Sequence, residues 1–340
     1  MKQFDWMTPD DVAHAARAAT ATVATAMLSR SGQPTTDAAV LKAGGIDLLD
    51  LMKEDLLSPH RLINLLSIPG LDRIEPQGGG LRIGPTVTLA QLAAHEAVRA
   101  RFRALADAAG ASASPQIRHL ATLGGNLLQR PRCWYFRSHA HHCARKGGDT
   151  CFAFAGENQY HAIFGHRGCA IVHPSTCATA LVAFGGALEI TGPTGARREV
   201  SLEAFFRLPE TDLQRENDLL PGEIVTAIRI PAHPHTTRSI HLKQGETDSF
   251  DWPIAEVAVA LDLADGVCRR ASVVLGAAAP VPHRAVQAEA ALAGRAINEA
   301  LLRTAARAAL EGAAPLSRNA YKLPIFEALV RRAMRAAMEA

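Results

Sequence analysis

Near its N-terminus the chain reads Lys42-Ala43-Gly44-Gly45-Ile46-Asp47-Leu48, with two glycines between an apolar run and a helical pattern. The apolar residues 38–43 predict a short buried strand. Glycine lets the main chain approach a ligand closely, and successive N–H groups at a helix start form a positive concavity suited to a pyrophosphate. Paired glycines before an acidic residue also make ordinary turns, so this loop alone leaves both interpretations open.

A second glycine pair lies in the run Ala121-Thr122-Leu123-Gly124-Gly125-Asn126, again among small residues that can form hydrogen bonds. Both loops offer amides and hydroxyls rather than side-chain charge, so together they favour a bound phosphate-bearing ligand. The sequence contains neither G-x-G-x-x-G nor G-x-x-x-x-G-K-[ST]. A Rossmann fingerprint and a P-loop are therefore not available to bind a nucleotide.

Five of the six cysteines lie between residues 133 and 177, in a basic and aromatic segment that includes the run 130–137. Thiolates are soft ligands that select zinc or iron–sulfur clusters. Buried free thiols and disulfides are the alternatives, but 340 residues need no disulfide staples. The first 30 residues lack a secretion signal and predict an amphipathic helix capped near Thr8-Pro9-Asp10-Asp11. Metal or cluster binding is thus the favoured interpretation.

Composition is that of a globular protein with 48% apolar and 20% charged residues and no apolar run long enough to span a bilayer. The net charge of +3 is small and its lysines and arginines are dispersed, so neither nucleic acid nor a membrane is expected as a partner. The length predicts two or three domains.

The remaining pattern predicts alternating strands and helices followed by a separate C-terminal unit. Thr88 reads as the cap of a helix over 89–95, with a second helix over 98–110. The turn 192–195 predicts a hairpin. After a linker at 232–238, we expect strands at 254–263 and 270–275 and then three helices, which begin near His283, Ala296 and Lys322.

Taken together, these motifs resemble the FAD-binding medium subunit of the xanthine dehydrogenase and molybdenum hydroxylase family. The subtype with an additional 4Fe-4S cluster, as in trimeric bacterial aldehyde oxidoreductases, is most similar. The matching pieces are 43–49, 121–126, His173-Pro174-Ser175, 132–137, 280–290 and 315–322.

The resemblance implies an α+β fold of two domains. Residues 1–231 would form a vanillyl-alcohol-oxidase (PCMH)-type FAD-binding domain with a 4Fe-4S insertion at about 130–170. Residues 239–340 would form a CO dehydrogenase flavoprotein-like C-terminal domain, with a small antiparallel sheet plus a three-helix bundle.

The resemblance also implies the ligand-binding residues. Cys177 and Cys268 are expected in the core, and no catalytic residue is expected in this chain. Three residues depart from the family pattern, namely Ile46, His119 and Thr176, and they place two side-chain contacts to FAD in doubt. The cluster ligands would be Cys133, Cys143, Cys151 and Cys169. The FAD-binding residues would be Lys42, Ala43, Gly44, Gly45, Ile46, Asp47, Leu48, Ser114, Thr122, Gly124, Gly125, Asn126, Ser175, Glu223 and Lys243.

The implied function is electron transfer within an oxidoreductase. A large partner subunit with a molybdenum cofactor would oxidise the substrate, and a small 2Fe-2S partner would pass electrons to FAD on this chain, in a heterotrimer or its dimer. We expect the 4Fe-4S cluster to lie largely off the direct path. The compartment would be the cytoplasm, or the periplasm with a twin-arginine-bearing partner. Two alternatives stay open: a zinc-binding structural module that uses His141 or His142, and a stand-alone flavin dehydrogenase.

Overall fold

The computed structural model describes residues 1–27 and 37–339, and the N-terminal part forms a small parallel sheet. Its strands are β1 (Asp5–Met7), β3 (Arg61–Asn64) and β2 (Ala39–Lys42), in that order. Helices α1 (Val12–Ala18), α2 (Val23–Met27) and α3 (Ile46–Lys53) and the short helix η1 (Leu65–Ser67) accompany it. Strand β2 and the helix after the glycine pair are as predicted.

The N-terminal helix differs from the prediction. Residues 5–7 pair with β3, and the helix begins only at Val12. Asp11 is the N-cap, since its side chain accepts a hydrogen bond from the His14 amide at 2.7 Å. The carboxylate nearest the helix start therefore displaces the predicted cap at Thr8 and Pro9.

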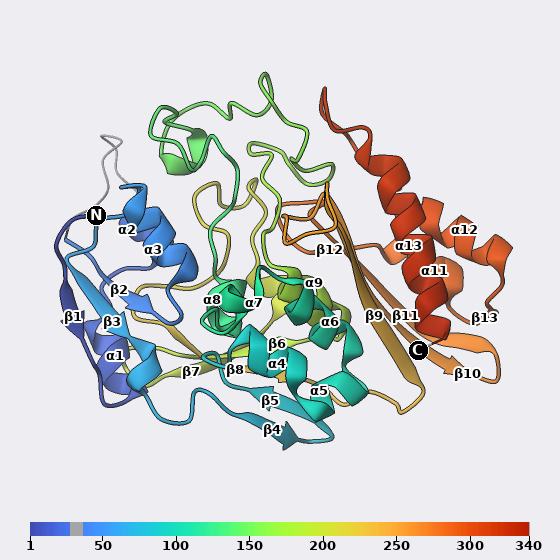
Figure 1. Ribbon diagram of the computed structural model, residues 1–340, viewed down its shortest axis with the longest axis horizontal. Coiled ribbons are helices and arrows are strands. Elements are labelled where there is room, and N and C mark those ends of the chain that lie inside the picture. Colours follow the sequence, from blue (N-terminus) through green and yellow to red (C-terminus); the bar gives the residue numbers. More distant parts are fainter. Residues whose placement is uncertain (28–36, 340) are drawn as a thin grey trace.

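A second sheet is antiparallel, and helices cover it (Figure 1). Phe102 divides the helix predicted over 98–110, because its backbone (φ −132°, ψ 48°) is not helical. Its ring is buried edge-on against Phe184, with centroids 5.2 Å apart. Thr88 caps its helix as predicted, in a capping box with Gln91. The strand order is β4 (Ile74–Gln77), β5 (Gly80–Ile83), β8 (Ile224–Ile230), β6 (Ala187–Thr191) and β7 (Arg197–Ser201). The helices are α4 (Leu89–Ala94), α5 (Glu96–Arg101), α6 (Arg103–Ala111), α7 (Pro115–Arg118), α8 (Leu123–Leu127), α9 (Thr176–Ala183) and α10 (Leu202–Phe205).

The C-terminal sheet is sandwiched between two layers. On β10 (Ala255–Ala264), Val257 and Val259 belong to the core shared with the C-terminal helices, whereas Ala258 and Ala260 belong to the core of the preceding domain. This alternation follows from the two-residue period of a strand. The other strands are β9 (Thr237–Gln244), β11 (Val267–Gly276), β12 (His283–Arg284) and β13 (Arg295–Ala296), and the helices are α11 (Val286–Leu292), α12 (Glu299–Ala308) and α13 (Lys322–Met338).

The α+β fold class is confirmed, with an antiparallel C-terminal sheet. The three C-terminal helices pack against one another and cover one face of the sheet, as predicted (Figure 1). One detail differs. Strand β9 begins at Thr237, within the segment predicted as a linker. No described helix has the length and apolar character that a membrane crossing requires.

The segment between α8 and α9 is mostly irregular. Among its described residues, only the short helix η2 (Ala144–Lys146) is regular. In Figure 1 it forms the green loops between the N-terminal layer and the C-terminal helix α13. It thus connects to both domains, and it carries the predicted cysteine ligands.

Candidate functional site

A cavity of about 530 Å³ lies where the two glycine loops meet. Nearly all the residues predicted to bind the ligand line it, together with Thr176. Ser175 is the exception: its hydroxyl donates to Asn126 Oδ1 at 2.6 Å and accepts from the Ala178 amide as the N-cap of α9. Ser175 therefore lies behind the wall and orients Asn126. The predicted residues on the wall are Lys42, Ala43, Gly44, Gly45, Ile46, Asp47, Leu48, Ser114, Thr122, Gly124, Gly125, Asn126, Glu223 and Lys243.

The first glycine loop has the geometry of an anion cradle. Gly45 has φ +84°, a left-handed conformation that favours glycine. In the part of the chain that the structure describes, the amides of residues 44–48 have no backbone acceptor. They sit at the N-terminus of α3, where the helix dipole favours negative charge. The loop can therefore hold an anionic group with its main chain.

The second glycine loop is different from the prediction, because its amides are already paired. The Leu123 amide donates to Val87 O and the Gly124 amide to Pro85 O, both at 2.8 Å. The Gly125 amide donates to Thr122 Oγ1 at 3.2 Å. This loop thus contributes van der Waals surface and the Asn126 side chain to the cavity wall. Its backbone amides, which were expected to bind the ligand, are not available.

Two further predicted residues line the cavity with their polar groups engaged elsewhere. Lys243 Nζ donates to Ala111 O at 2.8 Å and to Asp251 O at 3.1 Å, and burial lowers the pKa of Lys243. The Glu223 carboxylate accepts from Arg198 Nη2 at 2.7 Å. Of the departures from the family pattern, His119 is exposed and does not line the cavity.

The four predicted cluster ligands, Cys133, Cys143, Cys151 and Cys169, line one small enclosed cavity. It measures about 10 Å³, so a cluster would require this irregular shell to widen. Cys177 lies elsewhere, in the buried core around α9. Cys268 is buried in the C-terminal core. The placement of these two in the core is as predicted.

Polar and charged groups surround the thiols. His161 Nε2 lies 3.2 Å from Cys133 Sγ, and Arg145 Nε donates to Cys169 Sγ at 3.4 Å. A hydrogen bond from Cys151 and the nearby Arg145 guanidinium lower the pKa of Cys169 despite its burial. Burial lowers the pKa of the Arg145 guanidinium, but the nearby Glu216 and Cys169 raise it by more, so the net effect is a raised pKa. A negatively charged thiolate is thus matched by a buried cation.

The structure does not distinguish the two kinds of metal site that the sequence suggested. Within residues 1–27 and 37–339, no three His, Cys, Asp or Glu side chains are grouped to hold a metal ion, so neither a zinc ion nor a 4Fe-4S cluster is supported by the geometry as it stands. The His141 ring packs between Tyr135 and Phe152, with both centroid separations 5.0 Å.

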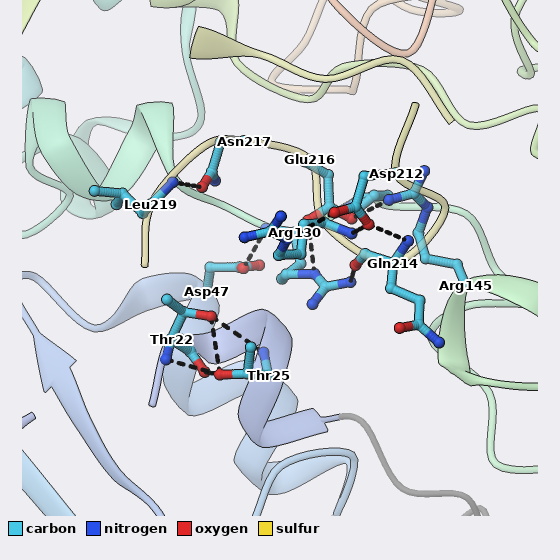
Figure 2. A network of polar contacts seen from close by, with 12 residues as sticks. Thr22, Thr25, Asp47, Arg130, Arg145, Asp212, Gln214, Glu216, Asn217 and Leu219 are labelled. Carbon is cyan, nitrogen blue, oxygen red and sulfur yellow. Dashed lines mark hydrogen bonds and ion pairs between the residues drawn. The ribbon is translucent and has the colours of Figure 1, made fainter. Parts of the chain in front are cut away.

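Sequence reasoning missed a buried network of charges between the two cavities (Figure 2). Asp47 Oδ2 accepts from the Arg130 amide at 2.8 Å, and its Oδ1 accepts from Arg137 Nη2 at 2.7 Å. Glu216 pairs with both Arg130 and Arg145. The partners are 71 or more residues apart in most of these contacts, so no local pattern marks Glu216.

Comparison with known proteins identifies the family of this chain. Residues 2–233 match the FAD binding domain in molybdopterin dehydrogenase, and residues 240–337 match the CO dehydrogenase flavoprotein C-terminal domain. The aldehyde oxidoreductase FAD-binding subunit PaoB of Escherichia coli is 36% identical over 286 residues, which cover 83% of this chain and 86% of that protein. The carbon monoxide dehydrogenase medium chain of Afipia carboxidovorans is 28% identical over 340 residues, covering 97% and 95%.

The fold also matches a solved structure of the same kind. Carbon monoxide dehydrogenase from Hydrogenophaga pseudoflava superposes with a TM-score of 0.73 at 27% identity, covering 99% of this chain and 98% of that chain. The relatives are subunits of oxidoreductases, so the predicted family and enzyme class are confirmed at this level. The chain belongs to the family of FAD-binding medium subunits of xanthine dehydrogenase and carbon monoxide dehydrogenase type.

Proposed function

We propose that this chain holds FAD in the 530 Å³ cavity and serves as an electron-transfer subunit of a molybdenum-containing hydroxylase. The observation that carries this proposal is that, among the described residues, the amides of residues 44–48 at the start of α3 have no backbone acceptor. They would bind the pyrophosphate with backbone N–H groups, which need no lysine or arginine. Bound FAD would accept electrons from one carrier and deliver them to another.

The other cavity residues would place the cofactor. The Ser114 and Thr122 hydroxyls and the Asn126 side-chain amide would supply hydrogen bonds to the cofactor. The main chain of both glycine loops would pack against it. Trp252, on the loop before β10, stacks on Arg132 with 4.6 Å between guanidinium and ring, and both line the cavity mouth. Ile46 and Thr176 lie on the wall without a family hydroxyl or carboxylate, so the main chain would carry more of the affinity.

We further propose a 4Fe-4S cluster on Cys133, Cys143, Cys151 and Cys169. The names of the relatives compared above mention no iron–sulfur cluster, so this proposal rests on this chain's own residues alone. Four buried or half-buried thiols share one cavity within an otherwise irregular segment. The Arg145 Nη2 group is buried there without a partner among the described residues, as expected of a donor to an inorganic sulfide.

The proposed partners are a large subunit with the molybdenum cofactor and a small 2Fe-2S subunit. Substrate chemistry would take place on the large subunit, and this chain would supply binding, orientation and charge around its cofactors. The compartment would be the cytoplasm, or the periplasm when a twin-arginine-bearing partner is exported with it. The domain boundary is proposed within residues 232–238.

The test is cofactor analysis of the chain co-purified with its partners. We expect FAD, iron and molybdenum in one complex, and visible absorption from both flavin and iron–sulfur in this chain. Cys151→Ser should lose the iron and keep FAD, whereas Cys177→Ala, at a buried cysteine outside the cavity, should keep both. Zinc in place of iron, or iron retained by Cys151→Ser, would contradict the cluster assignment. Absence of FAD would contradict the function as a whole.

A further inference from the structure

The Glu216 carboxylate lies between two buried arginines (Figure 2). Its Oε1 accepts from Arg145 Nη1 at 2.7 Å, and its Oε2 lies 3.0 Å from Arg130 Nε. The side chains of Glu216, Arg145 and Arg130 are 6%, 1% and 3% exposed. Because bulk water does not screen these charges, each of them interacts strongly with the charges beside it.

Arg145, Glu216 and Arg130 form a row of charges, and one end of this row lies at the cysteine cavity. Arg145 lines that cavity and donates through Nε to Cys169 Sγ at 3.4 Å. The same guanidinium donates through Nη1 to Glu216, so it cannot turn without changing both contacts. A change of charge on the Cys169 thiolate would therefore alter the interaction between Arg145 and Glu216.

The other end lies at the flavin cavity. Glu216 and Arg130 both line it, and the Arg130 amide donates to Asp47 in the first turn of α3. Arg130 is held further by a hydrogen bond from Nη2 to Gln214 O at 3.1 Å. The row thus ends beside the loop that is proposed to hold the pyrophosphate.

Each end also carries a donor without an acceptor. Among the described residues, Arg145 Nη2 and Arg130 Nη1 are buried and have no hydrogen-bond partner. Buried polar groups are nearly always paired, so each of these two donors is available to an acceptor that the described residues do not supply. Burying such charges is costly, and a purely structural contact could be made by apolar side chains.

We infer that Arg145, Glu216 and Arg130 couple the two cofactor sites, with Arg145 donating to the cluster and Arg130 to the flavin. This inference rests on the proposed function. With both cofactors bound, an electron taken up at either site would add negative charge, and Arg145, Glu216 and Arg130 would transmit its effect to the other site. The three residues are positioning residues, since they act through charge and hydrogen bonds rather than in a chemical step.

Redox titration of the purified complex tests this, with the flavin followed by visible absorption and the cluster by electron paramagnetic resonance. Glu216→Gln removes a buried negative charge, so it should raise both reduction potentials. Arg145→Gln removes a positive charge and should lower both. At the cluster we expect at least a tenfold change in the one-electron equilibrium, about 59 mV. Glu289→Gln is the matched control, a buried carboxylate paired with Arg284 in the C-terminal domain, and should move neither potential.

Charge-conserving variants separate coupling from a merely structural role. Arg145→Lys keeps the charge and should keep both potentials near those of the native protein, and Arg145→Gln carries the test if Glu216→Gln fails to fold. Shifts of the same sign in Glu216→Gln and Arg145→Gln would overturn the inference. So would a shift at the cluster with none at the flavin, while the proposed function would stand. A native complex without iron overturns the proposed cluster, and the inference with it.

Discussion

Gly44 lies against the main chain of Leu120, so closely that a Cβ atom at Gly44 would overlap the Leu120 carbonyl oxygen. The contact joins the loop after β2 to the turn between α7 and α8, which are far apart in the sequence. The two glycine loops therefore meet through their backbones. Only glycine at position 44 allows the cavity to close from both sides.

Gly44→Ala should separate the two loops and weaken FAD binding. We expect the FAD content to fall at least tenfold and the free energy of unfolding to fall by about 1–3 kcal/mol, as for other overpacked sites. The measurements are flavin content after purification and denaturant unfolding. Gly192→Ala is the control, because a Cβ there would lie 3.7 Å from Ala196 O, an ordinary van der Waals contact. Equal flavin content in the two variants would show that the contact does not shape the site.

Asp47→Asn should loosen the junction between α3 and the cysteine segment. Asp47 is 14% exposed and binds Arg132, Arg137 and the Arg130 amide. Its loss leaves partly buried arginines short of a partner, which we expect to lower the free energy of unfolding by about 2–4 kcal/mol. Asp50 pairs with the same two side chains but is 48% exposed. Asp50→Asn should therefore cost at most about 1 kcal/mol. Denaturant unfolding distinguishes the pair, and similar losses in both would refute the argument.

The features that the sequence predicts well are local. The helix start after the glycine pair, the cap at Thr88 and the hairpin at 192–195 each depend on residues within a few positions of one another, and they occur as expected. The convergence of the four cysteines follows from the family resemblance, and the cavity that they line agrees with it.

The features that it does not predict depend on distant partners. The amides of the second glycine loop are paired by Val87 and Pro85, which no pattern around Gly124 reveals. Ser175 faces Asn126 rather than the cavity for the same reason. Glu216 lies in an acidic, polar stretch that reads as a surface loop, and only the fold places it between two arginines.

His173→Asn should reduce the loss of stability in acid. Burial lowers the pKa of His173 to about 3 from its ordinary value of 6.5. Between these values the unfolded chain binds a proton that the folded chain does not, so stability is full above pH 6.5 and falls as the pH decreases towards 3. The slope is about 1.4 kcal/mol per pH unit. The asparagine side chain can still accept the hydrogen bond that the Ser175 amide donates to His173 Nδ1 in the native protein.

The comparison is denaturant unfolding of both proteins at about pH 7 and about pH 5. His161 and His283, whose pKa values burial also lowers to about 4, contribute equally to both proteins and cancel in the difference. Parallel pH dependences would show that His173 is protonated in the folded state.

Lys322 joins the C-terminal domain to the cysteine segment from a fully buried position. Its Nζ donates to His161 O at 3.1 Å and to Ala277 O, and Asn319 also donates to His161 O. Burial lowers the pKa of Lys322 to about 7 from 10.5. The ammonium is thus held by two carbonyl groups and lies 5.9 Å from the centroid of the Phe326 ring, in a site that favours the neutral amine above pH 7.

The effect of Lys322→Met on the free energy of unfolding should depend on pH and should narrow or change sign between about pH 9 and about pH 7. Between pH 7 and 10.5 the unfolded chain binds the proton that folded Lys322 lacks, so the native protein gains about 1.4 kcal/mol per unit as the pH rises, and the variant lacks this gain. At about pH 9 the variant should be less stable by about 1–3 kcal/mol, because two buried carbonyls lose a donor. Near pH 7 the native protein bears the cost of its buried charge, so the difference should narrow or reverse. Thiols that titrate above pH 8 affect both proteins alike and cancel. Denaturant unfolding across this range checks the crossing, and a constant difference would mean that Lys322 stays charged throughout.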